Sequence, residues 1–215
     1  DLTLSSKTGV AINSGGSINW DGGSGGLISI SALDSGGVTG AGGVVVVSGT
    51  VLDVDQAGDT TFSGVISGAG AFTKDGSGTM TLSGANTYTG GTTISAGTLK
   101  VTGALAGTAL SVSNGATYDV DATDTIVSIE GSGTIDLASG ITLTTFGTFD
   151  KEFSGVISGS GSLAKSGSGT TTLSGTNTFT GTTSVSRGTL KVTGSLADTA
   201  LSVSSGATYD VDATD

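Results

Sequence analysis

The stretch GSGTMTLSGANTYTGGTTISAGTLKV (Gly76–Val101) returns later in the chain as GSGTTTLSGTNTFTGTTSVSRGTLKV (Gly167–Val192). Both belong to a longer duplication, in which Phe62–Asp124 is repeated as Phe153–Asp215, 91 residues on, with 48 of 63 positions identical and no gap. Self-similarity at a fixed period is the signature of repeat architectures, in which each unit packs on its neighbour. The duplication therefore indicates an extended surface and not a single reaction pocket.

Within each copy, apolar residues alternate with Thr, Ser or Asp over three or four positions. Helix is disfavoured because Gly, Ser, Thr, Val and Ile dominate and no long window has a 3.6-residue apolar spacing. Period two over so few residues predicts short strands with one buried face, at Met80–Leu82, Thr98–Val101, Leu110–Val112, Tyr118–Val120, Ile135–Leu137 and Ile141–Leu143. Glycine-containing corners separate them, at Gly76–Gly78, Gly131–Gly133 and Gly167–Gly169.

Short strands, frequent corners and a repeat fit either a sandwich or a solenoid. The solenoid is favoured because near-identical blocks fit one another when stacked, whereas a sandwich has no reason to preserve such a block. We predict an all-β chain, folded as a right-handed parallel β-helix (β-solenoid) in a single elongated rod, with coils of about 20 to 25 residues. The residues predicted to face inward are Leu82, Leu99, Val101, Leu110, Val112, Val120, Ile135 and Leu137.

The repeat phase divides this one continuous solenoid into three parts. Residues 1–60 are predicted to form divergent coils, 61–151 the first 91-residue repeat unit, and 152–215 a second, truncated unit. The chain begins at Asp1 and has one methionine, Met80. We interpret it as a processed or excised piece of a longer protein.

The composition excludes several classes of function. Forty glycines in 215 residues are typical of disorder, but charged residues make up only 12% and the apolar residues alternate regularly, which favours a folded chain. The net charge of −11 argues against nucleic acid and anionic lipid as partners. The sequence contains no run of 18 apolar residues, so no membrane helix is predicted. The basic residues are scattered, at Lys7, Lys74, Lys100, Lys151, Lys165, Arg187 and Lys191.

The chain lacks the residues on which most catalytic sites depend. It has no histidine and no cysteine, and its only glutamates are Glu130 and Glu152. We therefore predict no catalytic, cofactor-binding or metal-binding residue, no cofactor and no enzymatic activity. A polysaccharide-active enzyme on a β-helix, working with Asp, Arg and Lys, remains the alternative.

Aspartates offer one further metal hypothesis. Asp119, Asp121 and Asp124 recur as Asp210, Asp212 and Asp215, and Asp53, Asp55 and Asp59 are similarly spaced. Asp119 and Asp121 are predicted to share the outward face of a strand, and a corner could bring Asp124 close enough to help bind Ca²⁺. The favoured interpretation is that they are solvated carboxylates that oppose lateral aggregation.

Three other patterns have an ordinary interpretation and a functional one. The cluster Gly22–Gly26 has neither a following helix nor a lysine, so a corner or linker is favoured over a phosphate cradle. The pairs Thr79 with Thr81 and Thr142 with Thr144 could form ice-binding ladders, but outward threonines are ordinary in strands. Trp20 could be a sugar platform, although packing at a coil end is favoured.

The duplicated block closely resembles the autotransporter-associated β-strand repeat, also called the passenger-associated transport repeat. In the first copy the resemblance lies in Gly64–Gly68, Lys74, Gly76–Thr79, Thr81–Ile94 and Gly97–Leu99. In the second it lies in Gly155–Gly159, Lys165, Gly167–Thr170, Thr172–Gly175, Asn177–Gly181 and Gly188–Leu190, with mild departures at Thr176, Phe179, Thr182 and Val185. It does not reach residues 1–60.

The resemblance implies a cellular location and a role. Proteins with this repeat are typically giant passengers, secreted across the outer membrane or displayed on the bacterial cell surface, which fold outside as right-handed β-helices. Many are adhesins or stalks, and the repeat is associated with export. The expected partners are neighbouring repeats or chains, by coil stacking, and cell-surface or matrix ligands, with no nucleic acid and no membrane insertion of this segment. The alternative role is a subunit of an extracellular filament, built by end-to-end stacking of solenoids.

Overall fold

A computed structural model of the chain describes residues 2–6, 10–11, 17–19, 27–32, 38–105, 107–197 and 199–212, with side chains from residue 39 onward. These residues form two compact units, Asp1–Thr108 (unit 1) and Ala109–Asp215 (unit 2), and each is treated by itself. Only strands, turns and bends occur in the described ranges. Accordingly, none of them contains a helix that could span a membrane.

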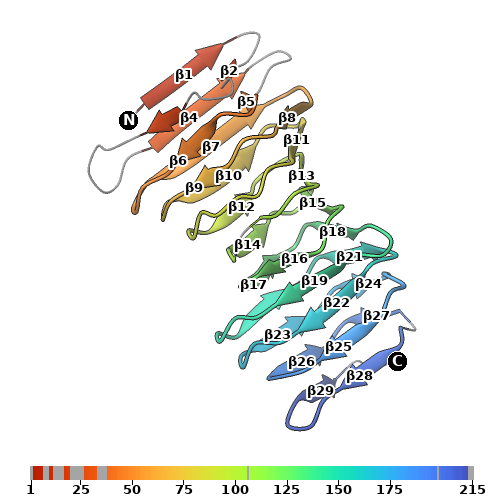
Figure 1. Ribbon diagram of the computed structural model, residues 1–215. Coiled ribbons are helices and arrows are strands. Elements are labelled where there is room, and N and C mark those ends of the chain that lie inside the picture. Colours follow the sequence, from red (N-terminus) through yellow and green to blue (C-terminus); the bar gives the residue numbers. More distant parts are fainter. Residues whose placement is uncertain are drawn as a thin grey trace. The chain divides into compact units, whose positions relative to one another are not determined.

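Unit 1 is a stack of parallel strands (Figure 1). One sheet has the order β1-β4-β7-β10-β12, a second β8-β11-β13 and a third β3-β6-β9, and β2 pairs with β5. The strands are β1 (Leu2–Ser6), β2 (Val10–Ala11), β3 (Ser17–Asn19), β4 (Leu27–Ala32), β5 (Val38–Thr39), β6 (Gly43–Val45), β7 (Val51–Gln56), β8 (Thr60–Phe62), β9 (Ile66–Ser67), β10 (Ala71–Asp75), β11 (Thr79–Leu82), β12 (Thr92–Ile94) and β13 (Thr98–Val101).

Unit 2 has the same design. Its sheets have the orders β14-β17-β20-β23-β26-β29, β15-β18-β21 and β16-β19-β22-β25-β28, and β24 pairs with β27. The strands are β14 (Ala109–Val112), β15 (Thr117–Val120), β16 (Asp124–Ile126), β17 (Ser128–Gly131), β18 (Thr134–Leu137), β19 (Thr142–Thr145), β20 (Lys151–Phe153), β21 (Val156–Gly159), β22 (Ser162–Lys165), β23 (Thr170–Leu173), β24 (Thr176–Asn177), β25 (Thr183–Val185), β26 (Thr189–Val192), β27 (Ser195–Leu196), β28 (Leu201–Val203) and β29 (Thr208–Val211).

Strand pairing joins one turn of chain to the next. Partners lie as few as 17 residues apart, as for Thr117 and Thr134, and as many as 28 apart, as for Val10 and Val38. Such parallel pairing at the distance of one turn defines a β-solenoid, and the described strands make about nine turns. The predicted fold class, a parallel β-solenoid, is confirmed. The predicted boundaries at residues 60 and 151 concern the phase of the repeat and stay predictions.

The interior of each unit consists of apolar ladders, in which equivalent residues of successive turns lie side by side. In unit 1, Phe62 pairs with Leu82, which pairs with Val101. In unit 2, Phe153, Leu173 and Val192 form the equivalent ladder. Burial alternates along β11, β13, β14, β15 and β18, which confirms the predicted facing, and the following predicted inward residues are all completely buried: Leu82, Leu99, Val101, Leu110, Val112, Val120, Ile135 and Leu137.

Candidate functional site

The two repeats share a group of buried polar side chains at equivalent positions. Lys74 and Lys165 are buried, and so are Asn86 and Asn177. These positions face inward, where the other residues of the ladders are apolar. Burying an amine or amide is unfavourable unless it is hydrogen-bonded, so their partners determine what the repeat does.

Asn86 joins three successive turns of unit 1. Its Oδ1 accepts a hydrogen bond from the backbone N–H of Ile66 in the preceding turn, at 3.0 Å. Its Nδ2 donates to the carbonyl oxygen of Gly84 in its own turn, at 3.2 Å, and to that of Ala104 in the next turn, at 2.9 Å. One side chain therefore supplies the acceptor for the Ile66 N–H and adds a second donor to two carbonyls that also bond backbone N–H groups. We call this arrangement the asparagine clamp.

Unit 2 repeats the asparagine clamp around Asn177. Here Oδ1 accepts from the N–H of Ile157 at 3.1 Å, while Nδ2 donates to the carbonyls of Gly175 and Ser195, both at 3.1 Å. The glycine beside each clamp allows the turns to approach closely. A Cβ on Gly84 would lie 2.0 Å from the carbonyl oxygen of Gly64. A Cβ on Gly175 would clash in the same way with the carbonyl oxygen of Gly155.

Lys74 occupies an apolar ladder, with Val54 and Ile94 as its lateral neighbours. Its Nζ donates to the carbonyl oxygens of Asp75 at 2.6 Å, Gly76 at 2.8 Å and Ala96, one turn further on, at 3.4 Å. The amine thus caps the corner that follows β10. Burial lowers the pKa of Lys74 below its ordinary value, and nearby carboxylates, chiefly that of Asp75, offset this only in part.

Lys165 is the equivalent residue of unit 2. It lies between Thr145 and Val185 in its ladder, and its Nζ donates to the carbonyl oxygen of Gly167. Burial again lowers the pKa of this lysine, against an opposing effect of Asp150. Both repeats therefore place a lysine inside the solenoid at the same corner.

The lowered pKa of Lys74 predicts a pH effect on stability. Between that lowered pKa and the ordinary value of 10.5, the unfolded chain binds a proton that the folded chain does not. Stability contributed by this group therefore rises with pH in that interval and is lost as pH falls through the folded pKa. We expect the free energy of unfolding of the native chain to rise, relative to Lys74→Met, as the pH increases toward 10.5. Urea unfolding at a series of pH values measures the difference, because groups common to both proteins cancel, and parallel curves would contradict the prediction.

A chain of hydroxyl groups lies next to the clamp in unit 1. The Tyr88 and Thr92 oxygens are 2.6 Å apart, those of Thr92 and Thr108 are 3.0 Å apart, and Thr108 donates to the carbonyl of Gly90 at 2.6 Å. The Tyr88 ring also packs on Phe72, with ring centroids 6.1 Å apart. In unit 2 the residue equivalent to Tyr88 is Phe179, which has the aromatic ring but no hydroxyl. The ring is thus common to both repeats, whereas the hydrogen bond is not.

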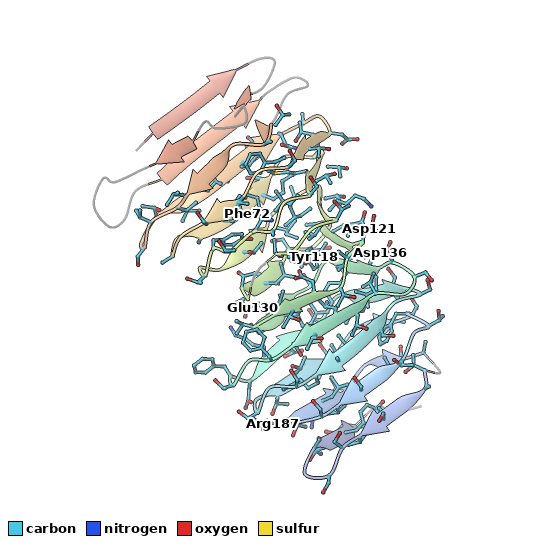
Figure 2. All side chains as sticks on the ribbon, viewed as in Figure 1. Phe72, Tyr118, Asp121, Glu130, Asp136 and Arg187 are labelled. Carbon is cyan, nitrogen blue, oxygen red and sulfur yellow. The ribbon has the colours of Figure 1, made fainter. Side chains whose placement is uncertain are left out.

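The predicted grouping of Asp124 with Asp119 and Asp121 is wrong. Asp121 is exposed on the outer side of unit 2, whereas Tyr118 lies among the strands (Figure 2). Asp124 is buried, and its Oδ2 accepts a hydrogen bond from the Tyr118 hydroxyl at 2.7 Å. Its Oδ1 accepts from the N–H of Thr125 at 3.0 Å. The corner turns Asp124 inward because Tyr118 supplies a partner there, and this carboxylate is directed away from the outward pair.

The second aspartate group lies on unit 1. Asp53 and Asp55 share the outward face of β7, and Asp75 pairs with Asp55 from β10. Burial raises the pKa of Asp53, with smaller effects of Asp75 and Asp55. Asp59 has a separate role, because its Oδ1 accepts a hydrogen bond from the N–H of Thr79 at 2.7 Å. No three His, Cys, Asp or Glu side chains in the described part of the chain are arranged to hold a metal ion.

The remaining acidic candidates have basic or hydroxyl partners. Lys191 contacts both Asp210, at 3.3 Å, and Asp212, while Asp215 lies outside the described residues. Glu130 forms an ion pair with Lys151 at 2.5 Å. Glu152 accepts a hydrogen bond from the hydroxyl of Ser174 at 2.6 Å.

The predicted threonine rows extend over few turns. Thr81 pairs with Thr61 on one side and Lys100 on the other, and Thr144 pairs with Thr125 and Ala164, so both rows are interrupted. Thr79 pairs with Thr98 of the next turn, whereas Thr142 pairs with Ser162. Trp20 and Gly22–Gly26 lie outside the described residues.

Sequence reasoning missed the burial of the lysines and asparagines. It noted Lys74 and Lys165 only as two of the scattered basic residues. Two signals in the sequence mark them, since each is retained in both copies of the block and each stands two positions after an inward apolar residue, Phe72 or Leu163. Residues two apart on a strand share a face, which places both lysines inside.

Parallel turns, glycine corners in backbone contact and internal polar clamps together define a β-solenoid repeat protein. The family model of the passenger-associated transport repeat matches residues 72–101 and 163–192. The chain therefore carries two passenger-associated transport repeats, as the resemblance implied, and its solenoid fold fits a passenger-associated β-helical segment. Each matched range contains one buried lysine and one asparagine clamp. No curated protein and no solved structure matches the chain.

Proposed function

We propose that this chain is a structural and adhesive segment of a large bacterial protein, secreted across the outer membrane or displayed on the cell surface, in which it acts as a β-helical stalk. The observation that carries this proposal is the pair of transport repeats within a stacked solenoid. Each asparagine clamp spans three turns, so its hydrogen bonds are complete only when the turn that follows the asparagine is in place. Turns that fold one after another outside the membrane would favour outward movement of the chain.

The proposed role is structural and not catalytic. The matched repeat is a structural unit of passenger segments. The buried lysines and asparagines bond to backbone groups of their own solenoid, which supports a role in building the coil. Turnover of a polysaccharide by the purified chain would contradict this proposal.

Ligands of the cell surface or matrix are the proposed external partners. Two phenylalanines support an adhesive contribution, because Phe146 and Phe149, at the corner between β19 and β20, are 41% and 75% exposed. They lie outside both matched repeats, in a part of the chain that is not duplicated. The acidity of the chain supports partners other than nucleic acid.

The export role predicts that removing a transport repeat lowers surface yield. Phe62, Leu82 and Val101 occupy one ladder, so deletion of residues 62–100 removes two whole turns, 39 residues, and rejoins the chain in phase. We expect the amount of full-length protein at the bacterial surface to fall at least about threefold, because outward folding loses clamped turns. Surface labelling of cells that express the full-length protein measures this yield.

A deletion of equal length outside the repeats is the matched control. Asp124, Leu143 and Leu163 also share a ladder, so deletion of residues 124–162 removes 39 residues in phase and leaves both matched ranges complete. This variant should be displayed at close to the native level. Undiminished display of the first deletion, or equal loss from both, would argue against a specific export role.

An extracellular filament is the second candidate, and one observation favours it. Leu201, Val203 and Val211 are 45%, 41% and 51% exposed, whereas the equivalent Leu110, Val112 and Val120 are fully buried. This apolar face of the last described turn fits a further turn of chain, and a stacked second molecule would cover it equally well. Electron microscopy separates the two, because continuous fibres support the filament and isolated particles support the stalk.

A further inference from the structure

Two nearly identical turns of unit 2 differ at one chemically important position. The turn Ser113–Ala116 joins β14 to β15, and Ser204–Ala207 joins β28 to β29. Each is closed by a 3.0 Å backbone hydrogen bond, from the N–H of Ala116 or Ala207 to the carbonyl of the serine three residues earlier. The second residue is Asn114 in the first turn and Ser205 in the other. Only the first turn therefore contains an Asn-Gly pair.

The glycine of each turn lies away from packed chain. Gly115 has φ of +82° and Gly206 of +83°, and a Cβ on either would meet no atom within 4 Å. Asn114 and Gly115 are both exposed. Because glycine tolerates both signs of φ, the peptide plane between them can rotate without steric cost and without disturbing a neighbouring turn.

We propose that Asn114–Gly115 is a site of spontaneous covalent modification, at which the asparagine deamidates through a cyclic imide. The backbone nitrogen of Gly115 attacks Cγ of Asn114, the new N–Cγ bond closes a five-membered ring, and the Cγ–Nδ2 bond breaks. The amide nitrogen leaves as ammonia and takes up the backbone proton through water. Water then adds to either imide carbonyl, which leaves aspartate or isoaspartate and one additional negative charge.

The asparagine clamps are protected from the same reaction. Asn86 and Asn177 are buried, and both polar atoms of each side chain are hydrogen-bonded. Each is followed by a β-branched threonine, Thr87 or Thr178, whose side chain crowds the attacking nitrogen. Held away from the near-attack geometry, these residues should react slowly. The modification therefore marks one exposed corner and leaves the stacking contacts intact.

Tryptic peptides separate Asn114 from the two clamp asparagines. Cleavage after lysine and arginine gives 75–100 with Asn86, 101–151 with Asn114 and 166–187 with Asn177, each the sole asparagine of its peptide. The purified chain is incubated at mildly alkaline pH and digested with trypsin, and the masses of the peptides are measured by mass spectrometry. We expect peptide 101–151 to gain about 1 Da, at a rate at least about tenfold that of the other two. Equal rates in all three peptides would overturn the proposal.

Exchange of the differing residue between the two turns tests the structural argument. Asn114→Ser should abolish the mass gain in peptide 101–151. Ser205→Asn places an Asn-Gly pair in the second turn, and peptide 192–215, which natively has no asparagine, should then gain mass at a rate within about threefold of the native site. A gain that persists in Asn114→Ser, or an unreactive Ser205→Asn, would show that the turn geometry does not create the site.

Discussion

Leu82→Asp is expected to lower the free energy of unfolding of the surrounding turns by about 4 kcal/mol, since it buries a charge without a partner. Leu82 is completely buried, and its lateral neighbours on both sides, Phe62 and Val101, are apolar. A carboxylate there must take up a proton or pull its turn open. In a stack each turn is stabilised by the turns on either side, so the damage should reach both of them.

Thr81→Asp is the matched control for this change. Thr81 is the preceding residue of β11, faces outward, and lies between Thr61 and Lys100. A carboxylate at this position stays hydrated and faces a basic residue, so the expected change is within about 0.5 kcal/mol. Hydrogen exchange and limited proteolysis resolve local opening of turns in each variant. If the two variants opened to the same extent, the inward and outward assignment of this strand would be wrong.

Asn86→Leu is expected to cost about 3 kcal/mol, because it removes three hydrogen bonds of the buried clamp. The N–H of Ile66 loses its acceptor, while the carbonyls of Gly84 and Ala104 lose one donor each and keep their bonds from the backbone N–H groups of Ala104 and Asn86. Leucine is close to asparagine in size, so the loss reports hydrogen bonding and not a cavity. Asn177→Leu should have a similar effect on unit 2, whose clamp has the same partners in equivalent positions.

The exposed neighbour Thr87 provides the comparison. Thr87→Ala changes a side chain that is in solvent one residue from the clamp, and it should leave the free energy of unfolding within about 0.5 kcal/mol of native. Chemical unfolding together with hydrogen exchange at Ile66 measures both variants. An Asn86→Leu protein as stable as Thr87→Ala would mean that water replaces the clamp and that the clamp does not hold the turns together.

Most of the architecture could be predicted from local pattern. Alternation over three or four residues placed Leu82, Leu110 and Ile135 correctly, because period two specifies which side of a strand a residue occupies. The gapless duplication favoured stacked turns over a sandwich, and parallel pairing at the distance of one turn confirms this. The strand near residue 141 begins one position later than predicted, at Thr142.

The polar interior was harder to predict. Lys74 was counted only among the scattered basic residues, although the carbonyls of its own corner and of Ala96 make its burial possible. Asp124 was expected to be near Asp119, but the Tyr118 hydroxyl provides an inward partner. In both cases the decisive partner lies at a corner, where the backbone leaves the regular period of the strand. A pattern of residue types does not describe that geometry.

The order of residues alone was enough to establish the repeat, the short parallel strands, the apolar ladders and the likeness to passenger segments, since these depend on periods that can be counted along the chain. Folding settled which amines, amides and carboxylates enter the interior. A buried polar group is stable only where donors or acceptors come within hydrogen-bonding distance. The geometry of a corner brings the Gly76 carbonyl to Lys74 and the Tyr118 hydroxyl to Asp124, and the stacking of turns brings backbone groups of both adjacent turns to Asn86.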